Sequence, residues 1–228
     1  MAVIDLNADL GEGMGDDAGL LRIVTSANVA CGAHAGDTDT MRSVCGLAAR
    51  LGVRVGAHIS YEDRSNFGRT PMAVAPEVLA ASVRAQLERL SDVAAECGTE
   101  VTYLKPHGAL YHQVAVDPIQ AEAVLGATGT LAVMGLAGSR LLELATAAGR
   151  TTIVEGFPDR GYRSAHRLIP RGDPGALIEG ADQIAANAVA LAAGVDSLCL
   201  HGDSPDAVAS AAAVRQALEA AGYDVRTW

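Results

Sequence analysis

Short apolar runs alternate with longer stretches of helical spacing along the chain, and the unit recurs about seven times. The apolar runs, which we predict to be strands, are Val3–Ala8, Ala27–Cys31, Val53–Ala57, Val101–Leu104, Thr130–Met134, Thr152–Val154 and Ser197–Leu200. The predicted helices are Thr38–Leu51, Ala75–Cys97, Pro118–Leu125, Ser139–Ala148, Gly175–Ala193 and Pro205–Ala221. This alternation favours a parallel sheet covered by helices. A last run, Tyr223–Trp228, is either an eighth strand or a tail.

Glycines mark the ends of the predicted helices, and the chain shows no internal boundary. The glycines are Gly52, Gly98, Gly149, Gly194 and Gly222, placed as C-terminal caps are. No linker or shift in composition divides residues 1–228, so we expect one domain, and this length fits one parallel β/α barrel. The alternative is an open doubly wound sheet. Its usual G-x-G-x-x-G turn is missing, because the glycines within residues 11–15 are spaced differently.

The composition narrows the classes of partner and the compartment. Hydrophobic residues make up 50% of the chain and charged residues 19%, a mixture that folds rather than stays disordered. The net charge of −10 argues against nucleic acid or an anionic membrane as a partner. No apolar run reaches the roughly 18 residues of a membrane span, and Asp5 and Asp9 interrupt the first segment, so we expect neither a membrane helix nor a signal peptide. The scattered cysteines predict a reduced, cytoplasmic protein. The sequence leaves the oligomeric state open, with a homo-oligomer as one alternative.

Polar side chains share one face of the first predicted strand. Because side chains alternate between the two faces of a strand, Asp5, Asn7 and Asp9 lie on one face and the intervening apolar residues on the other. In a barrel the apolar face packs against the helices and the polar face points inward. Two carboxylates and an amide are poor packing material, so we expect this face to serve a site.

Histidines stand at the C-terminal ends of several apolar runs. These residues are His34, His58, His107 and His201. Parallel α/β proteins build their sites at that end of the sheet. A single histidine there is readily explained by a hydrogen bond to a buried loop, but four at equivalent strand ends favour a shared site. By the same alternation of faces, Asn28, Glu155 and Asp203 belong with them.

Lys105 is the only lysine, since the other 16 of the 17 basic residues are arginines. A lysine can lose its proton and act as a base or nucleophile, which arginine effectively cannot do. Lys105 shares a strand face with His107. We therefore expect an amine in the same site as the histidines.

Two charged loops follow the predicted strands. The first spans Tyr61 to Arg69, and the second contains Arg160, Arg163, His166, Arg167 and Arg171, with Asp159 as its only acid. A solvated loop with surface ion pairs explains such a cluster, and so does an anion site for a carboxylate or phosphate. The aromatic residues Tyr61, Phe67, Tyr111, Phe157 and Tyr162 are candidates for the walls of a small pocket beside these loops. The set as a whole suits acid–base chemistry on a small polar substrate.

A divalent metal is an alternative use for the same residues, because aspartate with two histidines is a usual ligand set. No H-x-H or H-x-x-x-H spacing assigns the ligands. The metal hypothesis therefore depends on convergence of distant residues in space.

Four linked motifs resemble those of the LamB/YcsF family. They are Asp5-Leu6-Asn7-Ala8-Asp9-Leu10-Gly11-Glu12, Ser26-Ala27-Asn28-Val29-Ala30-Cys31-Gly32 with His34-Ala35-Gly36-Asp37, Lys105-Pro106-His107-Gly108-Ala109-Leu110-Tyr111, and His201-Gly202-Asp203-Ser204-Pro205. The resemblance runs in order to about Gly222, with departures at Ala33, Ile59 and Pro158 and a short segment before Ser197. It implies an irregular seven-stranded parallel β/α barrel of the glycoside hydrolase and deacetylase type. It also implies ATP-dependent opening of 5-oxo-L-proline to L-glutamate, together with two partner subunits, of B and C types.

The resemblance suggests roles for the candidate residues. ATP would activate the lactam through the complex, a base such as Asp9 or a histidine would direct water, and Lys105 and the arginines would hold negative charge. The residues expected to be catalytic are Asp9, His34, Lys105, His107 and His201. Those expected to bind substrate are Asn7, Asn28, His58, Arg69, Tyr111, Glu155, Arg160 and Asp203.

Two other functions compete with this one. The first is a metal-dependent deacetylase or amidohydrolase that acts alone on a small polar substrate, and it predicts bound metal and turnover without ATP. The second is a non-catalytic member that binds a metabolite, and it predicts binding without turnover. The polar strand ends favour the two enzymatic hypotheses.

Overall fold

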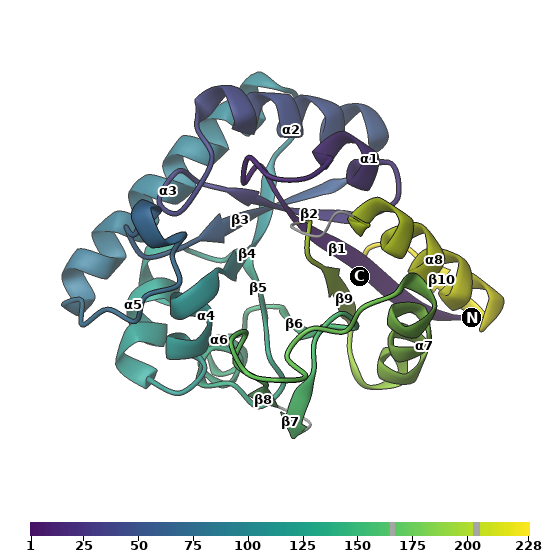
Figure 1. Cartoon of the computed structure of the whole chain (residues 1–228). Helices are drawn as coiled ribbons and strands as arrows, with labels where there is room; N and C mark the ends of the chain where they lie inside the picture. The colour runs from purple at the N-terminus through teal and green to yellow at the C-terminus, as the bar shows by residue number, and fades with distance from the viewer. Residues whose placement is uncertain (165–166, 203–205) are drawn as a thin grey trace.

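The computed structural model describes residues 1–164, 167–202 and 206–228, and its centre is a closed barrel of parallel strands surrounded by helices (Figure 1). In spatial order the barrel strands are β1 (Ala2–Leu10), β2 (Ser26–Ala30), β3 (Arg54–Ile59), β4 (Val101–Pro106), β5 (Ala132–Gly135), β6 (Thr152–Gly156) and β9 (Ser197–Leu200). β9 pairs with both β6 and β1, so the sheet closes on itself. The predicted seven-stranded parallel β/α barrel is therefore confirmed.

The C-terminal run forms a short strand outside the ring. β10 (Tyr223–Val225) pairs with Ala2–Ile4 of β1, and β9 pairs with the residues that follow, Asp5–Ala8. β1 thus has two neighbours in succession along the same edge. This extra pairing makes the barrel irregular at the end where both termini lie.

Helices cover the outside of the barrel. Among the described residues they are α1 (Asp17–Leu21), α2 (Thr38–Leu51), α3 (Pro76–Glu96), α4 (Gly108–Val114), α5 (Pro118–Ala127), α6 (Arg140–Ala147), α7 (Ala181–Leu191) and α8 (Ala207–Ala220). The helix predicted from Gly175 begins only at Ala181, because Gly175 and Gly180 have positive φ angles of 79° and 89° that a helix does not allow. The prediction missed α1 and α4, since segments of 5 and 7 residues are too short to show a helical period.

Most of the predicted glycine caps are confirmed. Gly52 ends α2 in the left-handed conformation and donates its N–H to the carbonyl of Ala48. Gly98, Gly149 and Gly222 follow α3, α6 and α8 with positive φ angles. The prediction was wrong for the glycine before β9, which closes the short 3-10 turn η2 (Ala192–Gly194) and is not a left-handed cap.

The barrel interior is polar, as the alternation on the first strand predicted. Asp5, Asn7 and Asp9 are buried and point inward, while the intervening apolar residues of β1 belong to the main hydrophobic core under the helices. Gly56 of β3 leaves room for the Tyr103 ring, because a Cβ atom there would lie 2.2 Å from Tyr103 Cζ. A layered polar column therefore runs through the barrel beside a small apolar cluster of Tyr103, Met134 and Ile153.

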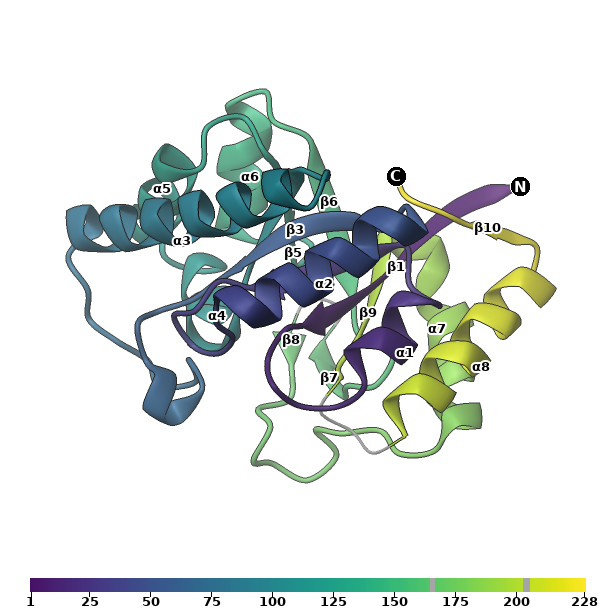
Figure 2. The ribbon, with the colours of Figure 1, turned by 90° about the horizontal axis from the view of Figure 1, so that it is seen from above.

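Several loops gather at one end of the barrel. Figure 2 shows the 3-10 turn η1 (Arg64–Asn66) and the antiparallel pair β7 (Tyr162–Ser164) and β8 (Arg167–Leu168) on one side, with both termini on the opposite side. The strands end on the side of these loops. Within the described ranges, no helix is both long enough and apolar enough to cross a membrane.

Candidate functional site

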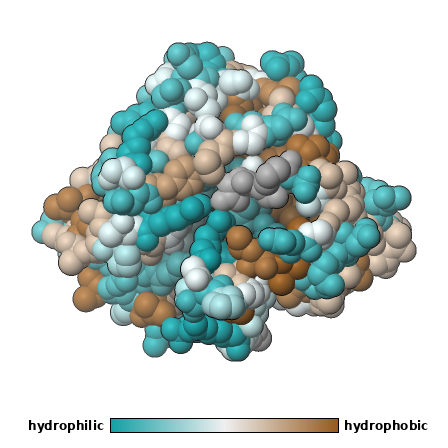
Figure 3. Space-filling view, viewed as in Figure 1, coloured by the Kyte–Doolittle hydropathy of each residue, from teal (hydrophilic) through white to brown (hydrophobic). Residues whose placement is uncertain are grey.

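A cavity of about 340 Å³ opens at the C-terminal mouth of the barrel. Predicted site residues in its wall are Asp9, His58, Arg69, Lys105, His107, Tyr111, Arg160 and His201. Hydrophilic side chains gather at the centre of the corresponding face (Figure 3). Small-molecule sites run from roughly 300 to 1,000 Å³, so the volume suits a small ligand. The convergence expected from the strand ends is thus present.

Lys105 lies on the floor of this cavity between two carboxylates. Its Nζ is 2.8 Å from Asp9 Oδ1 and 2.7 Å from Glu155 Oε1, and it donates to Cys199 Sγ at 3.0 Å. Burial alone would lower the pKa of Lys105, but the surrounding negative groups, Asp9 foremost, raise it well above its ordinary value. Lys105 is therefore a fixed ammonium ion, which makes it unsuited to act as the base or nucleophile that its rarity suggested.

Asp9 is the carboxylate that faces both the lysine and the histidines. Its Oδ1 also accepts a hydrogen bond from Asn28 Nδ2 at 2.8 Å, and its Oδ2 is 3.4 Å from His58 Nε2. Burial opposes ionisation, but His58 and Lys105 hold the pKa of Asp9 well below its usual value. Asp9 is thus an ionised carboxylate at the cavity wall, and it can accept a proton only from a strong enough donor.

His201 forms a pair with Asp159. Its Nδ1 is 2.7 Å from Asp159 Oδ2, which also accepts the backbone N–H of His201 at 3.0 Å. Burial would raise the pKa of Asp159, but the His201 ring and its hydrogen bonds lower it below the ordinary value. An ionised Asp159 fixes the His201 ring with Nδ1–H toward the carboxylate, so that Nε2 is left to exchange protons.

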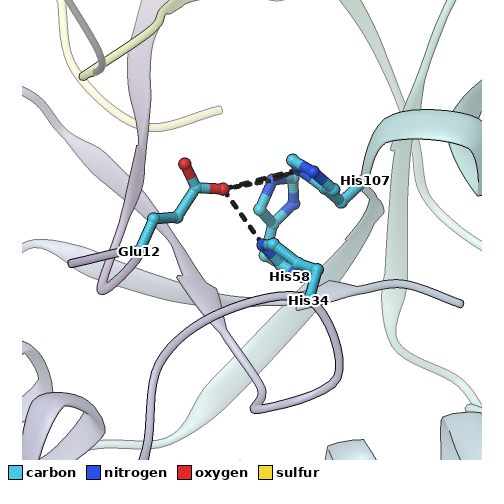
Figure 4. Close-up of side chains that lie close together, drawn as sticks. All are labelled: Glu12, His34, His58 and His107. Carbon is cyan, nitrogen blue, oxygen red and sulfur yellow. Dashed lines mark hydrogen bonds and ion pairs between the residues drawn. The ribbon is translucent and has the colours of Figure 1, made fainter. Parts of the chain in front are cut away.

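The remaining predicted histidines meet a glutamate beside Asp9 (Figure 4). Glu12 follows β1, His34 follows β2, His58 lies on β3, and His107 follows β4. Each residue offers one atom that can bind a metal, and these four atoms all lie within 4.8 Å of one another. Burial lowers the pKa of His34 to about 4, and burial with the neighbouring histidines lowers the pKa of His107. Both of these rings are neutral at pH 7.

Some predicted substrate-binding residues lie beneath the cavity and support its wall. Asn7 donates to Ser197 Oγ at 2.7 Å, and Asn28 Nδ2 donates to Asn7 Oδ1 at 2.7 Å as well as to Asp9. Glu155 Oε2 accepts the Tyr111 hydroxyl at 3.0 Å. His34 does not line the cavity, and its ring stacks on that of His107. Asp203 lies outside the described residues, as does His166 of the second charged loop.

The basic cluster divides into residues with different tasks. Arg160 donates from Nε to the carbonyl of Ala176 at 3.0 Å and from Nη2 to that of Ile169 at 2.7 Å, so it holds the loop after β6 together. Arg163 pairs with Asp173 on the surface. Arg69 and Arg171 line the cavity. The structure thus contains both the surface pair and the cationic cavity wall that the sequence left open.

Only some of the aromatic residues predicted to form a pocket line the cavity. Tyr111 and Phe157 line the cavity, whereas Phe67 packs edge-on against His34 and His107. Tyr162 supports the backbone of Phe157, whose N–H it accepts at 2.8 Å. The prediction was wrong for Tyr61, which borders a separate hollow. Tyr61 turns to that side because its ring packs into the main hydrophobic core.

Sequence reasoning did not select three residues of this region. Glu12 had a usable signal, because it follows a strand end by two residues within a glycine-rich loop. Asp159 was noted only as the acid of a basic loop, and its pairing with His201 spans 42 positions. His112 lines the cavity from α4, a helix that the prediction missed.

Comparisons with known proteins agree with the resemblance. The model of the LamB/YcsF family matches residues 4–228. The A-type subunit of 5-oxoprolinase from Streptomyces avermitilis is 50% identical over an alignment of 246 positions, gaps included, which covers 98% of each chain. Its counterpart from Mycobacterium leprae is 46% identical over an alignment of 251 positions, gaps included, which covers 100% of each chain.

Solved structures show the same fold. The lactam utilization protein of Thermus thermophilus superposes with a TM-score of 0.91 at 35% identity, covering 99% of this chain and 100% of that chain. A peptidoglycan N-acetylglucosamine deacetylase domain of Eubacterium rectale shares only the fold, with a TM-score of 0.55 at 14% identity over 99% of this chain and 88% of that chain. The family model, the relatives and the barrel agree, and the chain belongs to the LamB/YcsF family.

Proposed function

We propose that this chain is the lactam-opening subunit of an ATP-dependent 5-oxoprolinase that works with two partner subunits, of B and C types. The relatives named as A-type subunits of 5-oxoprolinase support the family activity. The observation that carries the proposal is the cavity itself, where Asp9, Lys105 and the His201–Asp159 pair converge. Such a set of groups suits a hydrolase that acts on a small polar amide.

The cavity matches the chemistry of 5-oxoproline. The guanidinium groups of Arg69 and Arg171 lie in its wall and provide positive charge for a substrate carboxylate, in a protein whose net charge is −10. The rings of Tyr111 and Phe157 provide an apolar surface for the methylene groups of a five-membered ring. A small, anionic, partly apolar substrate is therefore the class that we assign.

The proposed chemistry assigns one role to each polar group. The lactam is a stable amide, so the complex first transfers the γ-phosphoryl group of ATP to the lactam oxygen and releases ADP. Attack of water and cleavage of the C–N bond then give an acyl phosphate, from which a second water releases phosphate and leaves the carboxylate of glutamate. Asp9 directs the water, because activation of the carbonyl makes the attacking water acidic enough for a weakly basic carboxylate. His201 supplies a proton to the leaving nitrogen from Nε2, while Asp159 holds the ring. Lys105 keeps Asp9 ionised and offsets the negative charge that develops.

The test is glutamate production from 5-oxoproline and ATP. This chain is combined with its two candidate partner subunits, and each subunit is omitted in turn. We expect glutamate only from the complete mixture, and a large loss with Asp9→Asn. Asp173→Asn, which alters an exposed ion pair outside the cavity lining, is the matched control. Undiminished glutamate production without this chain would exclude the proposal.

A hydrolase that acts alone remains the second candidate, and the cluster of Glu12 with three histidines favours it. That candidate predicts lactam opening or acetate release from N-acetyl sugars without ATP or partner subunits. A metabolite-binding protein instead predicts tight 5-oxoproline binding with no turnover in the complete mixture. The same set of assays distinguishes all three.

A further inference from the structure

Four side chains from four consecutive barrel segments form a compact cluster beside the cavity (Figure 4). Glu12 Oε1 lies 3.0 Å from His34 Nε2, 3.4 Å from His107 Nδ1 and 3.7 Å from His58 Nε2. His107 Nδ1 and His58 Nε2 are 3.0 Å apart. One carboxylate oxygen and three imidazole nitrogens therefore surround a common point.

The outer hydrogen bonds fix which nitrogens carry protons. His58 Nδ1 is 3.1 Å from the carbonyl of Lys105, and His107 Nε2 is 2.9 Å from the carbonyl of Phe67. A carbonyl oxygen only accepts hydrogen bonds, so both outer nitrogens carry a hydrogen, and in the neutral form of each ring the inner nitrogen presents a lone pair. Backbone groups that orient histidine ligands in this way are the usual outer shell of a metal site.

Two lone pairs then face each other inside the cluster. His58 Nε2 and His107 Nδ1 are 3.0 Å apart, and neither can donate to the other while its ring is neutral. The Glu12 carboxylate brings a further acceptor to the same point. With both rings neutral, this arrangement of acceptors repels itself, and either a proton or a metal cation among them relieves the repulsion.

The spacing fits a small tetrahedral cation. With metal–nitrogen bonds of about 2.0–2.1 Å, adjacent ligand atoms of a tetrahedral zinc site lie about 3.3 Å apart. Four of the six separations, at 3.0, 3.0, 3.4 and 3.7 Å, bracket that value, and all six lie within 4.8 Å. Three imidazoles with one carboxylate suit zinc-like transition metals, whereas calcium and magnesium prefer oxygen ligands.

We propose that Glu12, His34, His58 and His107 bind one divalent transition metal ion of the zinc type. The three histidines are buried and come from the loop after β2, the end of β3 and the residue that follows β4. Glu12 comes from the glycine-rich loop after β1 and lines the cavity together with His58 and His107. Glu12 is thus the ligand whose departure would open a coordination position toward a substrate.

The proposed site adjoins the groups assigned to the reaction. Asp9 Oδ2 lies 3.4 Å from His58 Nε2, at the border between the cluster and the cavity. A metal of this type polarises a carbonyl or lowers the pKa of a bound water. Any role of the metal in lactam opening rests on the proposed function, but binding of the metal by the four side chains does not.

The test uses the full chain without an affinity tag, freed of metal by a chelator. Zn²⁺ binding is measured by titration calorimetry and elemental analysis, and Co²⁺ binding by its visible absorption spectrum, which reports coordination geometry. We expect one ion per chain, an intense tetrahedral Co²⁺ spectrum, and no displacement by excess Mg²⁺. A chain that binds neither ion stoichiometrically would overturn the proposal.

Variants locate the site. His58→Asn should weaken Zn²⁺ binding more than about a hundred-fold, because loss of even an outer partner typically costs 10- to 100-fold. Glu12→Gln keeps the shape of a partly exposed side chain, so it serves if the histidine variant does not fold. His112→Asn, a histidine of the cavity wall outside the cluster, should bind metal as the unaltered chain does. Unchanged Zn²⁺ affinity in both His58→Asn and Glu12→Gln would refute the assignment.

The two proposals fail separately. Metal binding without glutamate production in the complete mixture would leave this site intact and remove the proposed function. Glutamate production by a chain that binds no Zn²⁺ or Co²⁺ would do the reverse.

Discussion

Two carboxylates on the same face of β1, Asp5 and Asp9, lie at opposite ends of the barrel interior and behave oppositely. Asp5 accepts hydrogen bonds from the hydroxyls of Thr25 at 2.6 Å and Ser26 at 2.7 Å, and from that of Ser197. Burial outweighs these neutral donors and the positive charge of Arg54, so the pKa of Asp5 is raised.

Asp9 is also buried, but it lines the cavity and faces positive charge. Despite burial, His58 and the ammonium of Lys105 lower the pKa of Asp9 well below its usual value. One strand thus carries a carboxyl group with a raised pKa and, four residues later, a carboxyl group with a lowered pKa. Burial alone does not make a site; the cation placed beside the second carboxylate does.

The largest expected effect comes from removing that cation. Lys105→Met leaves Asp9 and Glu155 buried without their common partner, since both pair with Nζ. We expect the free energy of unfolding to fall by about 3–5 kcal/mol and glutamate production to be lost. Urea unfolding and the reconstituted assay measure the two effects.

Arg42→Met is the control for this variant. Arg42 pairs with Asp39 and Glu96 on the surface, where solvent screens the charges, so no measurable change is expected. Full activity of Lys105→Met would show that the charge beside Asp9 is unnecessary, and the contrast between the two carboxylates would lose its functional meaning.

The second prediction compares the two carboxylates directly. Asp9→Asn should lower glutamate production by roughly 10²–10⁴-fold, as loss of a positioned base does. Asp5→Asn should change the rate little and stability by about 1 kcal/mol, because the hydroxyls around it can reorient. Equal losses of rate in the two variants, compared at matched folded fraction, would contradict the assignment.

Local pattern was enough to predict the barrel and the inward face. The polar residues of β1 were placed correctly because the two-residue period of a strand needs no tertiary knowledge. The bounds of α2 were predicted to the residue, since Asp37 caps its start and Gly52 its end. Periodicity failed at α4, whose single short stretch follows a strand without a polar cap.

The sequence pattern could not predict which side chains of different strands contact each other in the site. The sole lysine was recognised, but its state depends on Asp9 and Glu155, which lie on other strands. Convergence of strand ends predicted proximity without saying which groups touch. Asn28 lies below the cavity, whereas Arg69 lies in its wall. This difference depends on depth along the barrel axis, and the alternation of side chains along a strand carries no information about that depth.

The third prediction extends the contrast to the histidines. The pKa of His34 is lowered from 6.5 to about 4 by burial, so the unfolded chain binds the proton more readily. The contribution of His34 to the free energy of unfolding is fully present above pH 6.5 and is lost as the pH falls toward 4. In the metal-free protein this loss amounts to about 3 kcal/mol. Urea unfolding in chelator across this range measures it.

His34→Gln should reduce the slope of stability against pH without abolishing it. The residual slope comes from His107, whose pKa is also lowered by burial. An identical slope in the variant and the unaltered chain would mean that the His34 ring is not held neutral.

The smallest effect is expected in the layer between the two carboxylates. The Tyr103 hydroxyl donates to Asn28 Oδ1 at 2.7 Å, and Asn28 Nδ2 in turn donates to Asp9. Tyr103→Phe leaves a buried acceptor without its donor, so we expect a loss of about 1–2 kcal/mol in urea unfolding. Tyr223→Phe on β10, outside the ring, is the control. If Tyr103→Phe lowers the rate as much as Asp9→Asn does, the middle layer belongs to the site, and the boundary between structural and reactive carboxylates lies deeper in the barrel than Asn28.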